Sequence, residues 1–119
     1  MILGLDISTS ITGYTVLDTE GSILVCGHID LRKEKNFFRK ARIIQLYLEM
    51  LAQDHDVKCT YIEQSLQSFR SGFSSAQTLS LLSKINGIVS WICYNMFNRE
   101  PHYIAAPSAR KLCGIKVSK

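Results

Sequence analysis

The chain has 119 residues, of which 46% are hydrophobic and 20% are charged. This balance is that of one globular domain with a single core, and it excludes a disordered chain. No apolar run reaches the roughly 20 residues of a membrane span, and no secretory signal precedes the first apolar segment. The net charge of +4 and the isoelectric point near 9.0 favour an anionic partner only weakly.

The N-terminal quarter of the sequence predicts three antiparallel strands, over residues 1–7, 13–18 and 23–29, because short turns separate them. The first strand is almost entirely apolar, yet Asp6 stands near its end. A carboxylate beside a sheet core loses hydration unless a cation or a hydrogen bond compensates for it. Asp6 therefore either caps the Ser/Thr-rich turn that follows or holds a metal or a phosphate-bearing ligand.

Residues 36–54 have the apolar spacing of one helix face, formed by Phe37, Ala41, Ile44, Leu48 and Leu51. The approach to this helix and its first turns are basic, and we interpret these cations as a solvated surface. The next strand, over residues 57–63, follows a helix, so a parallel crossover onto the first strand is expected. This strand also ends in an acid, Glu63.

A long helix is predicted over residues 73–97, after a loop over residues 64–72. Its apolar residues fall on more than one face, so it should be buried on more than one side. Either other helices of the same chain or a second copy in a homodimer would cover it. A short strand over residues 101–106 and a helix from residue 107 complete the chain.

The four cysteines lie far apart and have no paired-ligand spacing: Cys26, Cys59, Cys93 and Cys113. We interpret them as reduced thiols of the core in a cytosol-like compartment, because neither a zinc site nor a disulfide framework is supported.

The predicted topology makes the first and fourth strands parallel neighbours in the middle of the sheet. Asp6 and Glu63 then lie near matching ends of adjacent strands, where they could share cations. Carboxylates suit Mg²⁺, which retains waters and takes further ligands from a substrate phosphate. Two such ions stabilise both the attacking and the leaving oxygen of a phosphodiester displacement.

Three segments, ILGLDISTSITGY, YIEQS and PHYIAAPSARKLCGI, resemble the RuvC-type Holliday junction resolvases, in particular their bacteriophage members. The resemblance covers essentially the whole chain. It implies an α/β, RNase H-like domain over residues 1–119: a mixed five-stranded sheet, with three antiparallel strands and then parallel strands, flanked by helices. It also implies that Asp6 and Glu63 are the first two catalytic, metal-binding acids, with Mg²⁺ as the cofactor and Mn²⁺ as a plausible substitute. The expected partner is a four-way DNA junction, cut symmetrically by a homodimer that forms through the long helix.

Two departures from the family pattern matter. The family carries further acids, two aspartates three residues apart, on a later helix, whereas no acid follows Gly114 here. We therefore expect a C-terminal catalytic helix that is truncated relative to the family, weak metal binding, and slow or absent cleavage. Leu66 also stands where the family has an aromatic that separates the junction. Phe69 either takes this wedge role or folds back onto the long helix.

The remaining candidate DNA contacts are the turn after Asp6 and basic residues near the loop and the terminal helix: Ser8, Thr9, Arg70, Arg110, Lys111 and Lys116. Two other interpretations stay open. One is a fragment of an actin-like or sugar-kinase-type ATPase, whose Ser/Thr turn would meet nucleotide phosphates. The other is a non-catalytic protein that binds branched DNA and keeps the fold and the dimer. In each case we expect the cytoplasm of a bacterial cell or of a phage-infected host.

Overall fold

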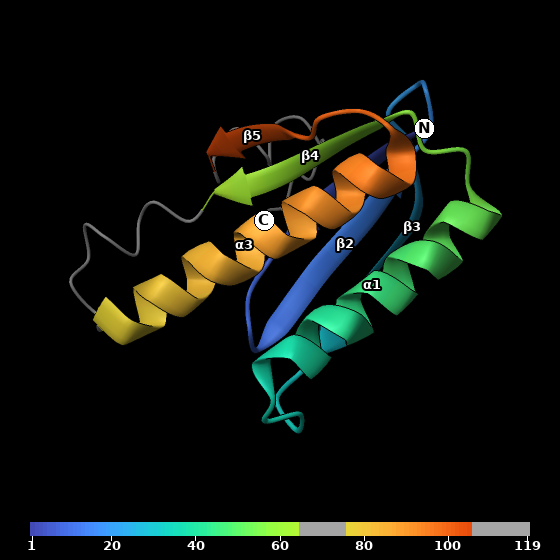
Figure 1. Cartoon of the computed structure of the whole chain (residues 1–119). Coiled ribbons are helices and arrows are strands. Elements are labelled where there is room, and N and C mark those ends of the chain that lie inside the picture. Colours follow the sequence, from blue (N-terminus) through green and yellow to red (C-terminus); the bar gives the residue numbers. More distant parts are fainter. Residues whose placement is uncertain (65–75, 106–119) are drawn as a thin grey trace, which may run out of the picture.

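Five strands form one mixed sheet in the computed structural model, which describes residues 1–64 and 76–105 (Figure 1). The order across the sheet is β3-β2-β1-β4-β5. The first three strands pair antiparallel, and β4 and β5 run parallel to β1. The strand bounds are β1 (Ile2–Asp6), β2 (Ile11–Leu17), β3 (Ile23–Asp30), β4 (Cys59–Gln64) and β5 (His102–Ala105). The predicted α/β class and the central, parallel β1–β4 pair are confirmed.

Two helices, α1 (Phe37–Asp54) and α3 (Ala76–Phe97), lie on the same face of the sheet (Figure 1). The core fills the space between them and the sheet, and its side chains come from alternate positions of the strands. Its fully buried members from β1, β2, β3, β4, α1 and α3 include Leu3, Val16, Ile29, Ile62, Ile44, Leu48, Ile85 and Val89. None of the helices in the described ranges is long and apolar enough to span a membrane.

Helix α1 begins where the sequence predicts it. Asn36 has an extended backbone, and its side-chain oxygen accepts a hydrogen bond from the backbone N–H of Arg39 at 3.0 Å. This bond satisfies one of the free amides of the first turn. Ala41, Ile44 and Leu48 are buried at steps of three and four residues, so the period seen in the sequence is the core face of the helix.

The two sides of α3 differ. Ile85, Val89 and Cys93 are buried against the core, whereas Trp91 is 62% exposed and Tyr94 is 49% exposed. The described residues therefore bury one side of this helix and leave Trp91 and Tyr94 exposed, and the two covers that the sequence leaves open, the same chain or a second copy, both remain predictions. The predicted start of this helix, residues 73–75, lies outside the described residues.

The cysteine prediction holds in part. Cys93 is buried in α3, and burial raises the pKa of its thiol to about 12. Cys59 is half-buried, but Cys26 is exposed, so its assignment to the core is wrong. Cys26 lies on the edge strand β3, and the alternation of that strand directs it away from the helix-covered face. These three cysteines are free thiols, and Cys113 lies outside the described residues.

Candidate metal-binding site

Asp6 and Glu63 follow the last paired residues of two adjacent strands. In the parallel β1–β4 pair, Leu5 lies opposite Ile62, and the two acids are the next residues along each chain. Neighbouring strands are about 4.8 Å apart. Leu5 and Ile62 are buried on the helix-covered face, so alternation directs both acids to the opposite face, where Asp6 is exposed and Glu63 is half-buried. The two carboxylates therefore lie at the same end of two adjacent strands, on the sheet face that the helices do not cover.

Gly13 leaves space beside Asp6. The two residues are register partners across the β1–β2 pair. A Cβ atom built on Gly13 would lie 3.8 Å from the Cβ of Asp6 and touch no other atom within 4 Å. The carboxylate of Asp6 is thus flanked by Glu63 on one strand and by a position without a side chain on the other. Gly13 therefore places no side chain against Asp6 on the β2 side.

The turn after Asp6 is braced by its own side chains. The Ser8 hydroxyl accepts hydrogen bonds from the N–H groups of Ser10 (3.0 Å) and Ile11 (3.1 Å), and it donates to the carbonyl of Ile11 at 3.1 Å. The Thr12 hydroxyl, which is fully buried, accepts from the Ser8 N–H at 3.2 Å and donates to the Ser8 carbonyl at 3.0 Å. Because these bonds close the turn within residues 8–10, β2 begins at Ile11, two residues before its predicted start.

Two further contacts fix this turn to the rest of the molecule. The half-buried ammonium of Lys40, on α1, donates a hydrogen bond to the carbonyl of Thr9. The N–H of Leu31, just after β3, donates to the carbonyl of Ser10 at 2.7 Å. Lys40 is not among the residues predicted to lie near the site, because it stands 31 positions from Thr9 and belongs to no motif. The only feature of the sequence that points to Lys40 is its position in the first turns of the helix that follows the three antiparallel strands.

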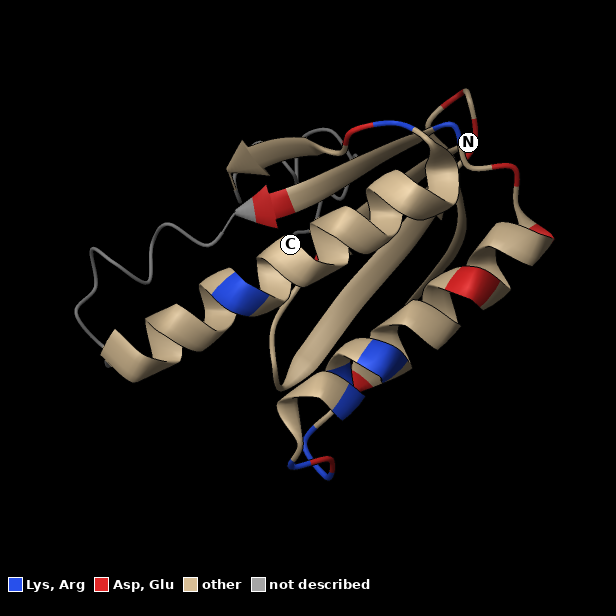
Figure 2. Cartoon of the chain, viewed as in Figure 1, with Lys and Arg blue, Asp and Glu red and all other residues tan. Residues whose placement is uncertain are grey.

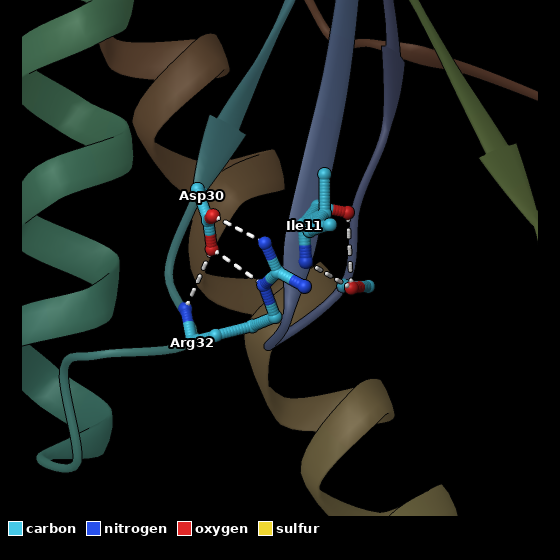
Figure 3. Close-up of polar contacts among 4 residues, drawn as sticks. Ile11, Asp30 and Arg32 are labelled. Atoms are coloured by element: carbon cyan, nitrogen blue, oxygen red, sulfur yellow. Dashed lines mark hydrogen bonds and ion pairs between the residues drawn. The ribbon is translucent and has the colours of Figure 1, made fainter.

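An ion pair closes the end of β3 beside this turn (Figure 3). Arg32 donates from Nε to one carboxylate oxygen of Asp30 at 2.9 Å and from Nη2 to the other at 2.7 Å, while its backbone N–H donates at 3.0 Å. The side-chain hydrogen bond and charge of Arg32 hold the pKa of Asp30 far below its usual range. Asp30 lies opposite Ile11 in the sheet, so the pair secures the strand on which the turn ends.

The donor set suits a hard divalent cation. Mg²⁺ is bound in proteins through one or two carboxylates, and waters and substrate phosphates supply its other ligands. Asp6 and Glu63 offer such a pair, and Gly13 leaves room beside it. Within residues 1–64 and 76–105, no group of three or more His, Cys, Asp or Glu side chains is placed to hold a metal. The other predicted DNA contacts lie outside these ranges: Phe69, Arg70, Arg110, Lys111 and Lys116.

Comparison with known proteins finds similarity in structure alone. No protein-family model and no curated protein matches the chain. The structure is similar to Thermus thermophilus RuvC in complex with a Holliday junction substrate, with a TM-score of 0.74 and 8% sequence identity over 99% of this chain and 81% of that one. It is also similar to a second Thermus thermophilus RuvC structure, with a TM-score of 0.67 and 9% identity over 99% and 82% of the two chains. The chain therefore has the RuvC type of RNase H-like fold.

Proposed function

We propose that this chain is a structure-selective endonuclease that resolves four-way (Holliday) DNA junctions by metal-dependent phosphodiester hydrolysis. The observation that carries the proposal is the parallel β1–β4 register, in which Asp6 and Glu63 stand at the same end of two adjacent strands. The similarity to a RuvC structure that holds a Holliday junction substrate supports branched DNA as the partner. The sequence motifs support the more specific likeness to bacteriophage members, which act in the cytoplasm of the host cell.

In this mechanism, Asp6 and Glu63 would hold Mg²⁺, or Mn²⁺ in its place, through their carboxylate oxygens. Such an ion would supply positive charge to polarise the scissile phosphate and would make a water molecule more acidic, and so a better nucleophile. The braced turn over residues 8–10 keeps a fixed position beside the acids and forms one side of the path for the cleaved strand. The Ser8 hydroxyl already donates its proton within the turn, so a phosphate contact by Ser8, like one by Thr9, stays a prediction.

The proposed active form is a homodimer, because symmetric cleavage of two strands requires two sites. Helix α3 supports this part of the proposal, since Trp91 and Tyr94 stand three residues apart on this helix and are both exposed. Contiguous apolar patches on the surface of a folded chain often mark interaction sites, whereas single exposed apolar residues do not.

Substitution of the two acids tests the proposal. Asp6→Asn and Glu63→Gln should each abolish Mg²⁺- or Mn²⁺-dependent junction cleavage, while junction binding measured without metal stays within about two-fold of the unsubstituted protein, since phosphate contacts supply most of the affinity. Asp56→Asn, an exposed acid that pairs with Lys58, is the matched control and should change neither property. Metal-dependent cutting by Asp6→Asn at the original rate would contradict the proposal.

A second candidate is a non-catalytic protein that binds branched DNA. It is favoured by the small number of acids that the described residues bring together. For this candidate, the protein binds four-way junctions selectively but does not cut them with either metal. A nucleotide-dependent rise in Tm without junction binding would instead favour the actin-like ATPase interpretation.

A further inference from the structure

The first turns of α1 and the loop before them carry a dense group of exposed cations, shown in blue in Figure 2. Lys33, Lys35, Arg39 and Arg42 are all exposed. Between residues of the described ranges, ion pairs join Asp30 with Arg32 and Asp56 with Lys58. The four exposed cations therefore form no ion pair with an acid of these ranges. We define them, together with Phe38, as the α1 basic surface.

The position of these cations is unfavourable for the helix itself. The N-terminal end of a helix carries a partial positive charge, so acidic residues stabilise this end and basic residues do not. The first turn of α1 contains no acid, and Arg39 and Lys40 follow within one turn of its cap at Asn36. A carboxylate close to this end is that of Glu34 in the preceding loop, which accepts a hydrogen bond from the Asn36 N–H at 3.0 Å and forms no ion pair with the four cations. Helix stability therefore does not account for this group of charges. A bound anion does, because the side chains and the free amides of the first turn would both attract it.

Phe38 adds a feature that a general anion site does not need. It is 73% exposed, the largest value among the exposed large hydrophobic residues of the described ranges. Its neighbour Phe37 is half-buried and packs against the core, and the two rings meet edge to face with centroids 5.4 Å apart. Phe37 thus anchors the first turn, and Phe38 presents an aromatic ring to solvent among the cations. Aromatic rings beside cations bind nucleotides, since bases stack on the ring and phosphates contact the charges.

Residues next to this surface contact the turn that follows Asp6. Lys40, between Arg39 and Ala41, donates its hydrogen bond to the carbonyl of Thr9 in the turn after Asp6. Leu31, two residues before Lys33, donates to Ser10 of the same turn. The α1 basic surface and the two acids therefore lie at the same end of the sheet, on either side of one braced turn. Because α1 covers one face of the sheet and the acids lie on the other, a DNA strand that contacts both would pass around this turn.

We propose that the α1 basic surface binds branched DNA next to the cleavage site: its cations contact phosphates, and Phe38 stacks on a base that the junction leaves unpaired. The inference rests on the proposed function, because it names the surface that would lead the substrate to the two acids. It assigns a role to residues whose sequence pattern alone indicates a solvated surface.

The charge contacts are tested by salt dependence. Lys35→Gln/Arg39→Gln should weaken binding to duplex and junction alike and should reduce the slope of log K against log salt by about 0.9 for each phosphate that is no longer neutralised. The control is Lys58→Gln/Arg99→Gln, which removes the same charge at the other end of the molecule, before β4 and after α3. An equal change of slope in both double variants would overturn the DNA-binding role of the α1 basic surface, since it would show a general effect of net charge.

The aromatic contact is tested with Phe38→Ala. It should lower the affinity for a four-way junction and for single-stranded DNA by about five-fold or more, the size expected when one base loses its stacking partner, and should leave duplex affinity unchanged. Because the Phe38 side chain is exposed, the variant should still fold, and circular dichroism checks this. As a direct probe, Phe38→Trp in a Trp91→Phe background places the single tryptophan in this surface, and junction DNA should quench its fluorescence. Unchanged fluorescence and unchanged affinity would overturn the stacking contact.

The outcomes separate this inference from the proposed function. If the unsubstituted protein cuts junctions and the α1 variants bind DNA as tightly as it does, the proposed DNA-binding role of the α1 basic surface is wrong and the proposed function stands. If the protein neither selects nor cuts junctions but Lys35→Gln/Arg39→Gln still lowers DNA affinity more than its control, the surface stands and the proposed function fails. If Phe38→Ala converts a dimer to a monomer without a change in DNA affinity, the α1 basic surface binds a second copy of the chain and the inference is overturned.

Discussion

At the scale of single residues, Gly27 is a position where the sheet cannot accept a side chain without rearrangement. It lies opposite Tyr14 in the β2–β3 pair. A Cβ atom on Gly27 would lie 2.7 Å from the Tyr14 hydroxyl oxygen and 2.9 Å from Cζ, closer than real contacts allow. The Tyr14 ring crosses this space and packs against Tyr47 of α1, with centroids 6.3 Å apart. The glycine therefore permits a contact between β2 and the helix layer.

Gly27→Ala should lower the free energy of unfolding by about 1–3 kcal/mol, because the Tyr14 ring must leave its place against Tyr47. Urea denaturation gives the value, and the near-ultraviolet circular dichroism of the tyrosines should change with it. Gly87→Ala is the control: Gly87 lies in α3 with open space around its Cβ position, so alanine there should stabilise the fold by about 0.5–1 kcal/mol. A Gly27→Ala variant as stable as the original would show that Tyr14 moves at no cost.

The Asp30–Arg32 pair gives a pH dependence whose sign follows from the pKa. The pKa of Asp30 is lowered from its ordinary value of 3.8 when the chain folds, so the unfolded chain takes up the proton first. Its contribution to stability is complete above pH 3.8 and is lost as the pH falls towards the folded-state value. Asp30→Asn should therefore flatten the acid side of the stability curve, measured as Tm between about pH 2 and 6. The exposed pair limits the size of the effect.

Sequence reasoning reached Asp6 and Glu63 because an acid at the end of an apolar strand is unusual, and because the order of elements made their strands neighbours. It did not reach Gly27 or Lys40. Their importance depends on which group lies opposite them, the Tyr14 side chain for one and the Thr9 carbonyl for the other. That information arises only when the strands and α1 are packed.

At the scale of elements, the first turn of α1 combines a good cap with unfavourable charge. Asn36→Asp should keep the hydrogen bond to the Arg39 N–H and add a negative charge at the positive end of the helix. We expect the unfolding free energy to rise by about 0.3–1 kcal/mol. On the proposed DNA-binding role of this surface, the same change should weaken DNA binding, because the carboxylate repels phosphate. Thermal unfolding and a binding titration on the same sample measure both effects.

Asn36→Ala is the comparison, since it removes the cap without adding charge and should cost about 1 kcal/mol. If Asn36→Asp raised stability and strengthened DNA binding together, the expected conflict between helix stability and DNA binding would be absent.

The bounds of the elements show what the sequence pattern determines. The predicted and observed bounds of α1 agree to within one residue, because its apolar period and its cap agree. The β2 strand begins earlier than predicted, since the Ser8 and Thr12 hydroxyls close the preceding turn in three residues. Strand β4 begins two residues later than predicted, at Cys59, because Val57 still bonds locally to the carbonyl of His55. Local hydrogen bonds, from side chains before β2 and from the backbone before β4, therefore set strand ends that hydrophobic alternation does not determine.

At the scale of the whole molecule, the exposed side of α3 predicts association. Trp91→Glu should convert the proposed homodimer into a monomer, because it places a charge in an apolar interface that must lose its water. Sedimentation velocity measures the mass. Since Trp91 is 62% exposed in the single chain, the variant monomer should still fold, and its Tm should no longer depend on protein concentration as that of a dimer does. Ile23→Glu, at a 50% exposed apolar position on β3, is the matched control and should leave the mass unchanged. A protein that is monomeric before substitution would contradict the dimer.

The order of the five strands was predictable because few topologies join a meander to a helix and a parallel strand without a left-handed crossover. The exposed side of α3 was not predictable in the same way. Its apolar residues indicate burial on several sides, but a sequence does not state whether its own chain or another one provides the cover.

The N-terminus of the chain is held by a segment far along the sequence, and this has a consequence for the order of folding. The Met1 amine donates to the Asp56 carbonyl at 3.2 Å, and the Lys58 N–H donates to the Met1 carbonyl at 2.8 Å. Closing a loop of this length costs more entropy than forming the hairpins of β1, β2 and β3. We therefore expect the meander to form early and the pairing of β4 with β1 to limit the folding rate. On a ribosome, Asp6 would meet Glu63 only after the whole segment over residues 7–62 has been synthesised.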